Sequence, residues 1–341
     1  MSKTTQGRSG VVIAGLGFGV AAGVALGVFA IAPNIPGGNG AEAEKAKRDF
    51  AAVSQDVEIY KAQAASADSV LSELAFSSVT GVLQDRSILV FKTADANNED
   101  VNAVERLLKA AGATNSGEIL LKEKFLDQAG ADALKTIIVN TLPAGAQLSV
   151  DNLAPGNHSG EALGSALFLN PENGEPQAGE EERGLLLRAL RDSGYINYED
   201  GTILPAQGIV IITGSSDGAG EKDFSAAQLA NFANALKTRG QGVVLSGRVH
   251  SAADTGTIGL IRSAKQERKP STVDSVDRQW AQIATVIAMR EQLDGGSGAY
   301  GAAASAEAAV PALPQPKEDK PEVENPAEIP APPVSEEING A

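Results

Sequence analysis

Residues 209–246, IVIITGSSDGAGEKDFSAAQLANFANALKTRGQGVVLS, contain the pattern that decides the fold. A β-branched apolar run at 209–212 and a second apolar run at 243–245 are each bounded by glycine. Between them, Ser225 and Gln228 have the spacing of a capping box, and Leu229, Phe232, Ala233 and Leu236 form one helical face. Strand, helix and strand in about forty residues predict a βαβ unit with parallel strands.

The same alternation extends over residues 85–300. Apolar runs at 87–91 and 119–121 predict two further strands. Helical spacing of apolar residues predicts four more helices, through 101–111, 134–141, 185–190 and 280–287. We therefore predict an α/β domain with a mostly parallel sheet covered by helices on both faces, and leave the strand order open.

Residues 10–32 form an uncharged apolar segment behind a short N-terminal tail at 1–9. As a helix, the segment is about 35 Å long, enough to cross a membrane. Its length favours a retained anchor, and a cleaved signal peptide ending at 30–32 is the alternative. Lys3 and Arg8 favour a cytoplasmic N-terminus and an exported body, in an inner or outer membrane that the residues do not specify.

Glycine recurs every fourth residue in this segment, and such spacing on one helix face permits close helix–helix packing. The alternative is the general abundance of glycine in membrane helices. The residues concerned are Gly15, Gly19, Gly23 and Gly27.

Residues 41–78 are predicted to form a helical stalk. Apolar residues there alternate spacings of three and four, which is the seam of a coiled coil. An amphipathic helix packed on its own domain is the alternative. Because the stalk and the anchor both favour self-association, we expect a homo-oligomer. The seam consists of Phe50, Val53, Val57, Tyr60, Ala64, Ala67, Leu71 and Leu74.

Composition excludes several classes of site and partner. The formal charge of −15 argues against nucleic acid as a partner, and the absence of Cys excludes disulfides and thiolate metal sites. Eight of the 16 prolines and six of the net negative charges lie in residues 302–341, which predicts a disordered Pro/Ala/Glu-rich tail.

The sequence contains one constellation of residues that looks catalytic. Asp95, Asp217, Arg248 and His250 follow predicted strands, so they could converge on one rim of the sheet. The alternative is that strand-end loops favour such residues for turn formation. No catalytic motif or resident cofactor is identified, so we do not expect an enzyme. The two histidines, at 158 and 250, are far apart, and we interpret the acidic stretch 172–182 as a solvated loop rather than a metal site.

Over about residues 10–301 the sequence resembles the actinobacterial copper transporter family, known as the MctB family. The likeness lies in an ordered series of stretches that begins with SILVFKTADANNEDV at 87–101 and LPAGAQLS at 142–149, and continues with LLRALRDSGYINY at 186–198, VIITG at 210–214, RGQGVVLSGR at 239–248, STVDSVD at 271–277 and GGSGAYG at 295–301.

The resemblance implies an envelope protein of copper efflux or tolerance, in a family described as outer-membrane and pore-forming. Copper would then be the transported ion, although the residues identify no copper ligands. If the protein conducts ions, the path would be an oligomeric assembly, because the sequence lacks the alternating strands of a transmembrane barrel. A scaffold that positions partners in the envelope is the alternative function.

Overall fold

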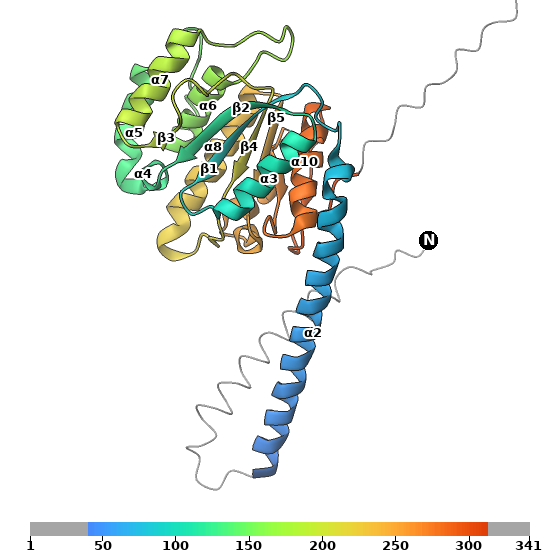
Figure 1. The fold of residues 1–341 in the computed structure, drawn as a ribbon. Coiled ribbons are helices and arrows are strands. Elements are labelled where there is room, and N and C mark those ends of the chain that lie inside the picture. Colours follow the sequence, from blue (N-terminus) through green and yellow to red (C-terminus); the bar gives the residue numbers. More distant parts are fainter. Residues whose placement is uncertain (1–39, 267, 313–341) are drawn as a thin grey trace, which may run out of the picture.

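The computed structural model describes residues 40–266 and 268–312 (Figure 1). The strands are β1 (Ser87–Thr93), β2 (Thr114–Leu121), β3 (Ile196–Asn197), β4 (Gly208–Ile212), β5 (Gly242–Ser246), β6 (Ser271–Val273) and β7 (Ala299–Tyr300). The α-helices are α2 (Gly40–Val79), α3 (Asn98–Ala110), α4 (Glu123–Leu126), α5 (Ala131–Asn140), α6 (Pro155–Leu167), α7 (Glu180–Asp192), α8 (Asp223–Arg239), α9 (Thr257–Ser263) and α10 (Gln279–Leu293). Short 3₁₀ helices span Gln128–Gly130, Gly220–Lys222 and Val249–Ala252.

The strands form one sheet in the order β3-β2-β1-β4-β5-β6-β7. Every neighbouring pair is parallel except β2 and β3, which are antiparallel. The prediction of a mostly parallel α/β sheet is therefore confirmed. The chain builds outward in one direction from β1 to β3 and in the other from β4 to β7. The point between β1 and β4 is thus a topological switch point, where open α/β sheets commonly bind ligands.

Alternate residues of the central strands fill two separate cores. In β4, Ile209 and Ile211 face one core, whereas Val210 and Ile212 face the other. Successive strand residues point to opposite sides of a sheet, so a strand covered on both faces has to be apolar throughout. This is why the 209–212 run contains no polar residue.

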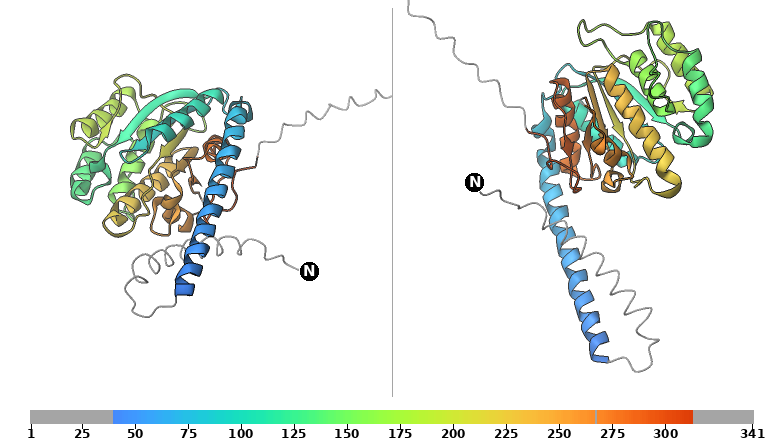
Figure 2. Two further views of the ribbon diagram at one scale, coloured as in Figure 1. Left: turned by 60° about the horizontal axis from the view of Figure 1, so that its bottom comes forward. Right: turned by 180° about the vertical axis from the view of Figure 1, so that it is seen from behind.

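The two cores correspond to two layers of helices. Helices α4 to α9 supply the core on one side of the sheet, and α2, α3 and α10 supply the other (Figures 1 and 2). On the first side, the Phe232 ring meets Phe91 and Phe125 edge-on, with ring centroids 5.5 and 5.2 Å apart. A single aromatic from α8 therefore joins the sheet to α4.

The predicted βαβ unit is present as β4, α8 and β5, but its predicted cap is wrong. The helix begins at Asp223, two residues before Ser225, and no side chain caps it. Gln228 is instead buried, and its amide donates to the carbonyl oxygen of Phe125 (3.3 Å). A residue that matched a local capping pattern thus makes a long-range contact.

Helix α6 is the main element that the apolar pattern did not predict. Its sequence, PGNHSGEALGSAL, is rich in residues that disfavour helices. Gly156, Gly160 and Gly164 line its contact with α8, where a Cβ on Gly156 would lie 2.2 Å from the Gln228 oxygen and one on Gly160 would lie 2.5 Å from the Phe232 oxygen. The four-residue glycine spacing therefore allows the two helices to approach at backbone distance.

Two predicted boundaries also change. The acidic residues Glu180, Glu181 and Glu182 form the first turn of α7 rather than a loop, in agreement with the preference of carboxylates for helix N-termini. The body does not end at residue 300, because the backbone N–H groups of Ala302 and Ala303 donate to the buried Asp274. Within the predicted tail, residues 302–308 belong to the fold, and those from 313 on lie outside the described residues.

Helix α2 covers the predicted stalk and runs beyond the body (Figures 1 and 2). Its C-terminal end packs on the body through Ala75 and Val79, which are buried in the core with α3 and α10. Asp68 forms an ion pair with Arg278 next to α10 (2.6 Å). The last turns of the stalk thus pack on their own domain, through residues outside the predicted seam.

The anchor predicted at 10–32, with its four regularly spaced glycines, lies outside the described residues. Of the helices in the described part of the chain, none combines the length and the apolar character needed to cross a membrane.

Candidate functional site

The carboxyl ends of β1, β4 and β5 lie along one edge of the sheet, at the switch point. Thr93, the last residue of β1, donates its hydroxyl proton to Asp95 Oδ1 (2.6 Å). The same hydroxyl oxygen lies 3.3 Å from Thr213 Oγ1, directly after β4. The two central strands are therefore joined at this edge by buried hydroxyl groups.

Asp95 and Arg248 both lie next to Gly214. A Cβ at Gly214 would lie 2.5 Å from Asp95 Oδ2, and the Arg248 backbone N–H donates to the Gly214 oxygen (3.1 Å). The Arg248 side chain, however, turns to α3 and binds the buried Asp100, with Nε 2.8 Å from Oδ2. This hydrogen bond raises the pKa of Arg248 above its usual value.

The other two predicted rim residues have local partners. His250 Nδ1 lies 3.0 Å from Ser215 Oγ. Asp217 Oδ1 accepts from the Ala219 backbone N–H (3.1 Å), and the Asp217 carbonyl oxygen accepts from Thr255 (2.6 Å).

Asp95, Asp217, Arg248 and His250 therefore follow strands that end at one edge, where the first, second and fourth bind groups of the strand-end loops and Arg248 binds Asp100 of α3. No group of three or more His, Asp or Glu side chains in the described part of the chain is arranged to hold a metal ion. The second histidine, His158, is buried in α6 with Nε2 3.0 Å from the Ser149 carbonyl oxygen.

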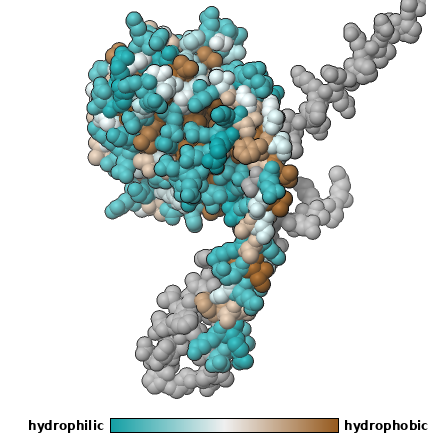
Figure 3. All heavy atoms as spheres, in the orientation of Figure 1, coloured by the Kyte–Doolittle hydropathy of each residue, from teal (hydrophilic) through white to brown (hydrophobic). Residues whose placement is uncertain are grey.

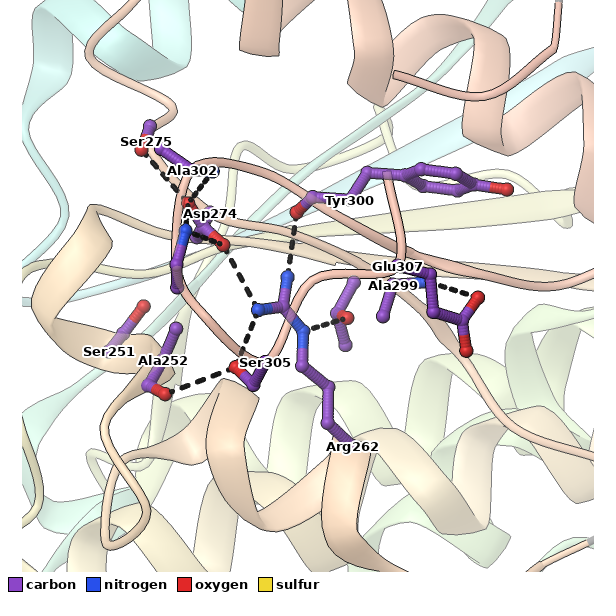
Figure 4. Close-up of polar contacts among 12 residues, drawn as sticks. Ser251, Ala252, Arg262, Asp274, Ser275, Ala299, Tyr300, Ala302, Ser305 and Glu307 are labelled. Atoms are coloured by element: carbon purple, nitrogen blue, oxygen red, sulfur yellow. Dashed lines mark hydrogen bonds and ion pairs between the residues drawn. The ribbon is translucent and has the colours of Figure 1, made fainter. Parts of the chain in front are cut away.

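A buried cluster around Arg262 and Asp274 joins the last strands to the segment that follows them (Figure 4). The Arg262 and Asp274 side chains are 5% and 0% exposed, with Nη1 3.0 Å from Oδ2. The guanidinium also donates to Thr272 (2.9 Å), to Ser305 (2.9 Å) and to the Tyr300 carbonyl oxygen (2.6 Å). Burial lowers the pKa of Arg262, and the negative charge of Asp274 opposes that effect.

Asp274 also accepts hydrogen bonds from its own neighbour in sequence and from the chain beyond β7. Its carboxylate accepts from the Ser275 hydroxyl (2.9 Å) and from the backbone N–H of Ala302 (2.7 Å). The Tyr300 hydroxyl donates to Glu291. Burial and, to a smaller extent, this hydrogen bond raise the pKa of Tyr300. The arrangement holds residues 299–308 against β6 and α9. It is a structural centre, and nothing in the sequence distinguished Arg262 in advance.

The exposed side of α2 is the second surface of interest. None of the predicted seam residues is buried, and its exposed large apolar side chains are Val57 (36%), Tyr60 (68%) and Leu74 (52%). Figure 3 shows apolar side chains along this helix outside the body. At 100° per residue, Val57 lies on the same side of α2 as Ala75, so the stripe that packs on the body continues beyond it.

A model of the family described as copper transport outer membrane protein, MctB, matches residues 8–311. The chain belongs to this family. It is 34% identical over 232 residues to the copper transporter MctB of Mycobacterium leprae (strain TN), a match that covers 65% of this chain and 72% of that protein. It is 33% identical over 229 residues to the protein of the same name from Mycobacterium tuberculosis (strain H37Rv), again covering 65% and 72%.

The family match includes every described element and ends one residue before the described chain does. Two of the stretches that carry the resemblance, 271–277 and 295–301, meet in the structure at the Asp274 cluster. The buried ion pair is therefore formed partly by residues that gave the family its likeness in sequence.

Proposed function

We propose that this protein acts in copper transport in the cell envelope, as a membrane-anchored homo-oligomer whose copies associate through α2. The observation that carries the proposal is the family match, because it runs from residue 8 to 311 and so includes the predicted anchor, the stalk and the body together. The relatives that match are named copper transporters. Copper is then the cargo, and the proposal assigns no catalytic step to the strand-end rim.

The exposed stripe on α2 supports the oligomeric part of the proposal. Apolar side chains at coiled-coil spacing gain stability when a partner helix removes them from water. Val57 and Tyr60 lie on the stripe beyond the body, whereas Ile59, which is 46% exposed, lies about 200° around the helix from Val57. The chain thus contains a matched control position for the seam.

The oligomer is tested with the full chain in an uncharged detergent, by light scattering after gel filtration. We expect V57E/Y60E to lower the mass to that of one chain and I59E to leave it unchanged. Equal masses for both variants would contradict association through the seam.

The copper role is tested in the source organism. We expect deletion of the gene to increase copper sensitivity, the wild-type gene to restore tolerance, and V57E/Y60E to restore it less well than I59E. A deletion strain as tolerant as its parent would refute the transport role and favour the envelope scaffold. Conductance of the purified protein in lipid bilayers, abolished by deleting residues 1–40, would favour an oligomeric pore over an accessory role.

A further inference from the structure

A cavity of about 610 Å³ lies between α7 and the loop that follows β3. Volumes of this size accommodate small organic molecules. Helix α7 contributes Arg183, Leu187 and Arg188 to its wall, and the loop contributes Tyr198 and Ile203. The cavity is at the opposite end of the sheet from the Arg262–Asp274 cluster, since β3 and β7 are the two edge strands.

Arg183 is the unusual residue of this cavity. It is only 8% exposed, yet among the described residues its guanidinium has neither a hydrogen bond nor an ion pair. Its nitrogens are not among the solvent-inaccessible side-chain atoms that lack a partner, so they reach the cavity, where a guanidinium offers five N–H donors in a fixed plane. An anionic group in the cavity would supply both the missing charge and the missing acceptors.

Of the two neighbouring arginines on α7, Arg191 has a partner and Arg188 is exposed. On the same helix, Arg191 forms an ion pair with Asp200 and stacks over the Tyr198 ring, 4.7 Å from its centroid. Asp200 lines the cavity but is therefore already neutralised. Arg188, which is exposed at the cavity, has no hydrogen bond or ion pair within the described chain and can contact the same anion.

The remaining wall defines the rest of the ligand. Leu187 and Ile203 are buried, at 3% and 8% exposure, and present apolar surface beside Arg183. Glu180 and Glu181 are exposed and also line the cavity, where a second negative charge on the ligand would be repelled. The site therefore combines one buried cation, an apolar wall and an acidic mouth.

We propose that this cavity binds an organic monocarboxylate with an apolar chain, its carboxylate on Arg183 and its chain on Leu187 and Ile203. The planar guanidinium fork matches a carboxylate in two parallel hydrogen bonds. This inference does not depend on the copper role, because no residue of the α2 stripe or of the strand-end rim contributes to the cavity.

The test is calorimetric titration of the full chain, in an uncharged detergent, with three six-carbon probes. Hexanoate carries one carboxylate, hexan-1-ol carries none, and adipate carries two. We expect hexanoate to bind. The other two probes should bind at least roughly tenfold more weakly, hexan-1-ol because it lacks a charge and adipate because the acidic mouth repels its second carboxylate. Hexanol or adipate binding as tightly as hexanoate, or no binding of hexanoate at millimolar concentration, would overturn the proposal.

Variants locate the site. We expect R183Q to weaken hexanoate binding at least roughly tenfold, R188Q to weaken it less, and R106Q, which removes an equal charge from the exposed side of α3, to leave it unchanged. Hexanoate binding by R183Q as tight as that by the wild type, or an equal loss of binding in R106Q, would overturn the assignment. If R183Q fails to fold, R188Q binding hexanoate as tightly as the wild type would overturn it instead.

Discussion

Replacing Asp274 with Asn removes one negative charge from the centre of the Arg262 cluster and leaves the side-chain shape almost unchanged. The Asp274 carboxylate is fully buried and accepts hydrogen bonds from Arg262, Ser275 and Ala302. An amide offers one acceptor oxygen in place of two, and its NH₂ group would face donors. The variant therefore leaves the Arg262 guanidinium buried without its counter-charge.

The size of the effect follows from the burial of both partners. Removing one member of a buried ion pair costs about 3–5 kcal/mol. For a body of this size, each kcal/mol lowers the melting temperature by roughly 2–4 °C, so D274N should melt roughly 6–20 °C below the wild type. The loss should also release residues 299–308, because Asp274 binds their backbone.

The chain provides a matched control in an exposed ion pair of similar length. Arg290 and Asp294 form an i,i+4 pair at 2.7 Å, with side chains 33% and 52% exposed. Such pairs contribute about 0.3–0.5 kcal/mol, so D294N should shift the melting temperature by no more than about 2 °C. The assay is thermal unfolding of the full chain, with amide hydrogen exchange at residues 299–308 as the local measurement.

Equal melting temperatures for D274N and D294N would refute the reasoning, since Asp274 is fully buried with several donors and Asp294 is half exposed and paired with Arg290. So would a destabilised D274N whose exchange at 299–308 matches the wild type. In that case the ion pair would stabilise the body without holding the last segment in place.

Two further predictions concern the pH dependence of stability and a backbone constraint. Burial lowers the pKa of Lys237 from 10.5 to about 8, so between these two pH values the unfolded state binds more protons and the free energy of unfolding rises with pH. In denaturant titrations K237M should abolish this rise, whereas K109M, on an exposed part of α3, should retain it. At Gly218, φ is +70° and a Cβ would lie 2.0 Å from the Thr255 oxygen, whereas Gly174 has φ +73° and open space around it. G174A should therefore cost only the roughly 1–2 kcal/mol of a left-handed residue, and G218A should cost clearly more. Equal losses of stability in chemical denaturation would contradict the close contact at Gly218.

The elements that the sequence predicted correctly are those with a strong local period. The β4–α8–β5 unit was found because residues 209–212 and 243–245 have to be apolar on both faces of the sheet. Strands β6 and β7 were missed because they have three and two residues, too few to show a period. Helix α6 was missed because glycine disfavours a helix in isolation, and its stability comes from packing on α8.

The candidate sites divide in the same way. The structure places the four rim residues after strands β1, β4 and β5, but their partners were not predictable, since Asp100 is 148 residues from Arg248 in the chain. Arg262 and Arg183 carried no signal at all. An arginine in a helix is ordinary, and only the surrounding fold shows that one has a buried counter-charge and the other has none.

The sequence by itself therefore determined the α/β class, the helical stalk and the family, because each depends on apolar period or on stretches of matching residues. The tertiary structure decided the strand order, the close α6–α8 contact, the side of α2 that meets the body and the partners of the buried charges. These depend on contacts between residues far apart in the chain, whose energies come from burial and electrostatics that no local pattern of residues records.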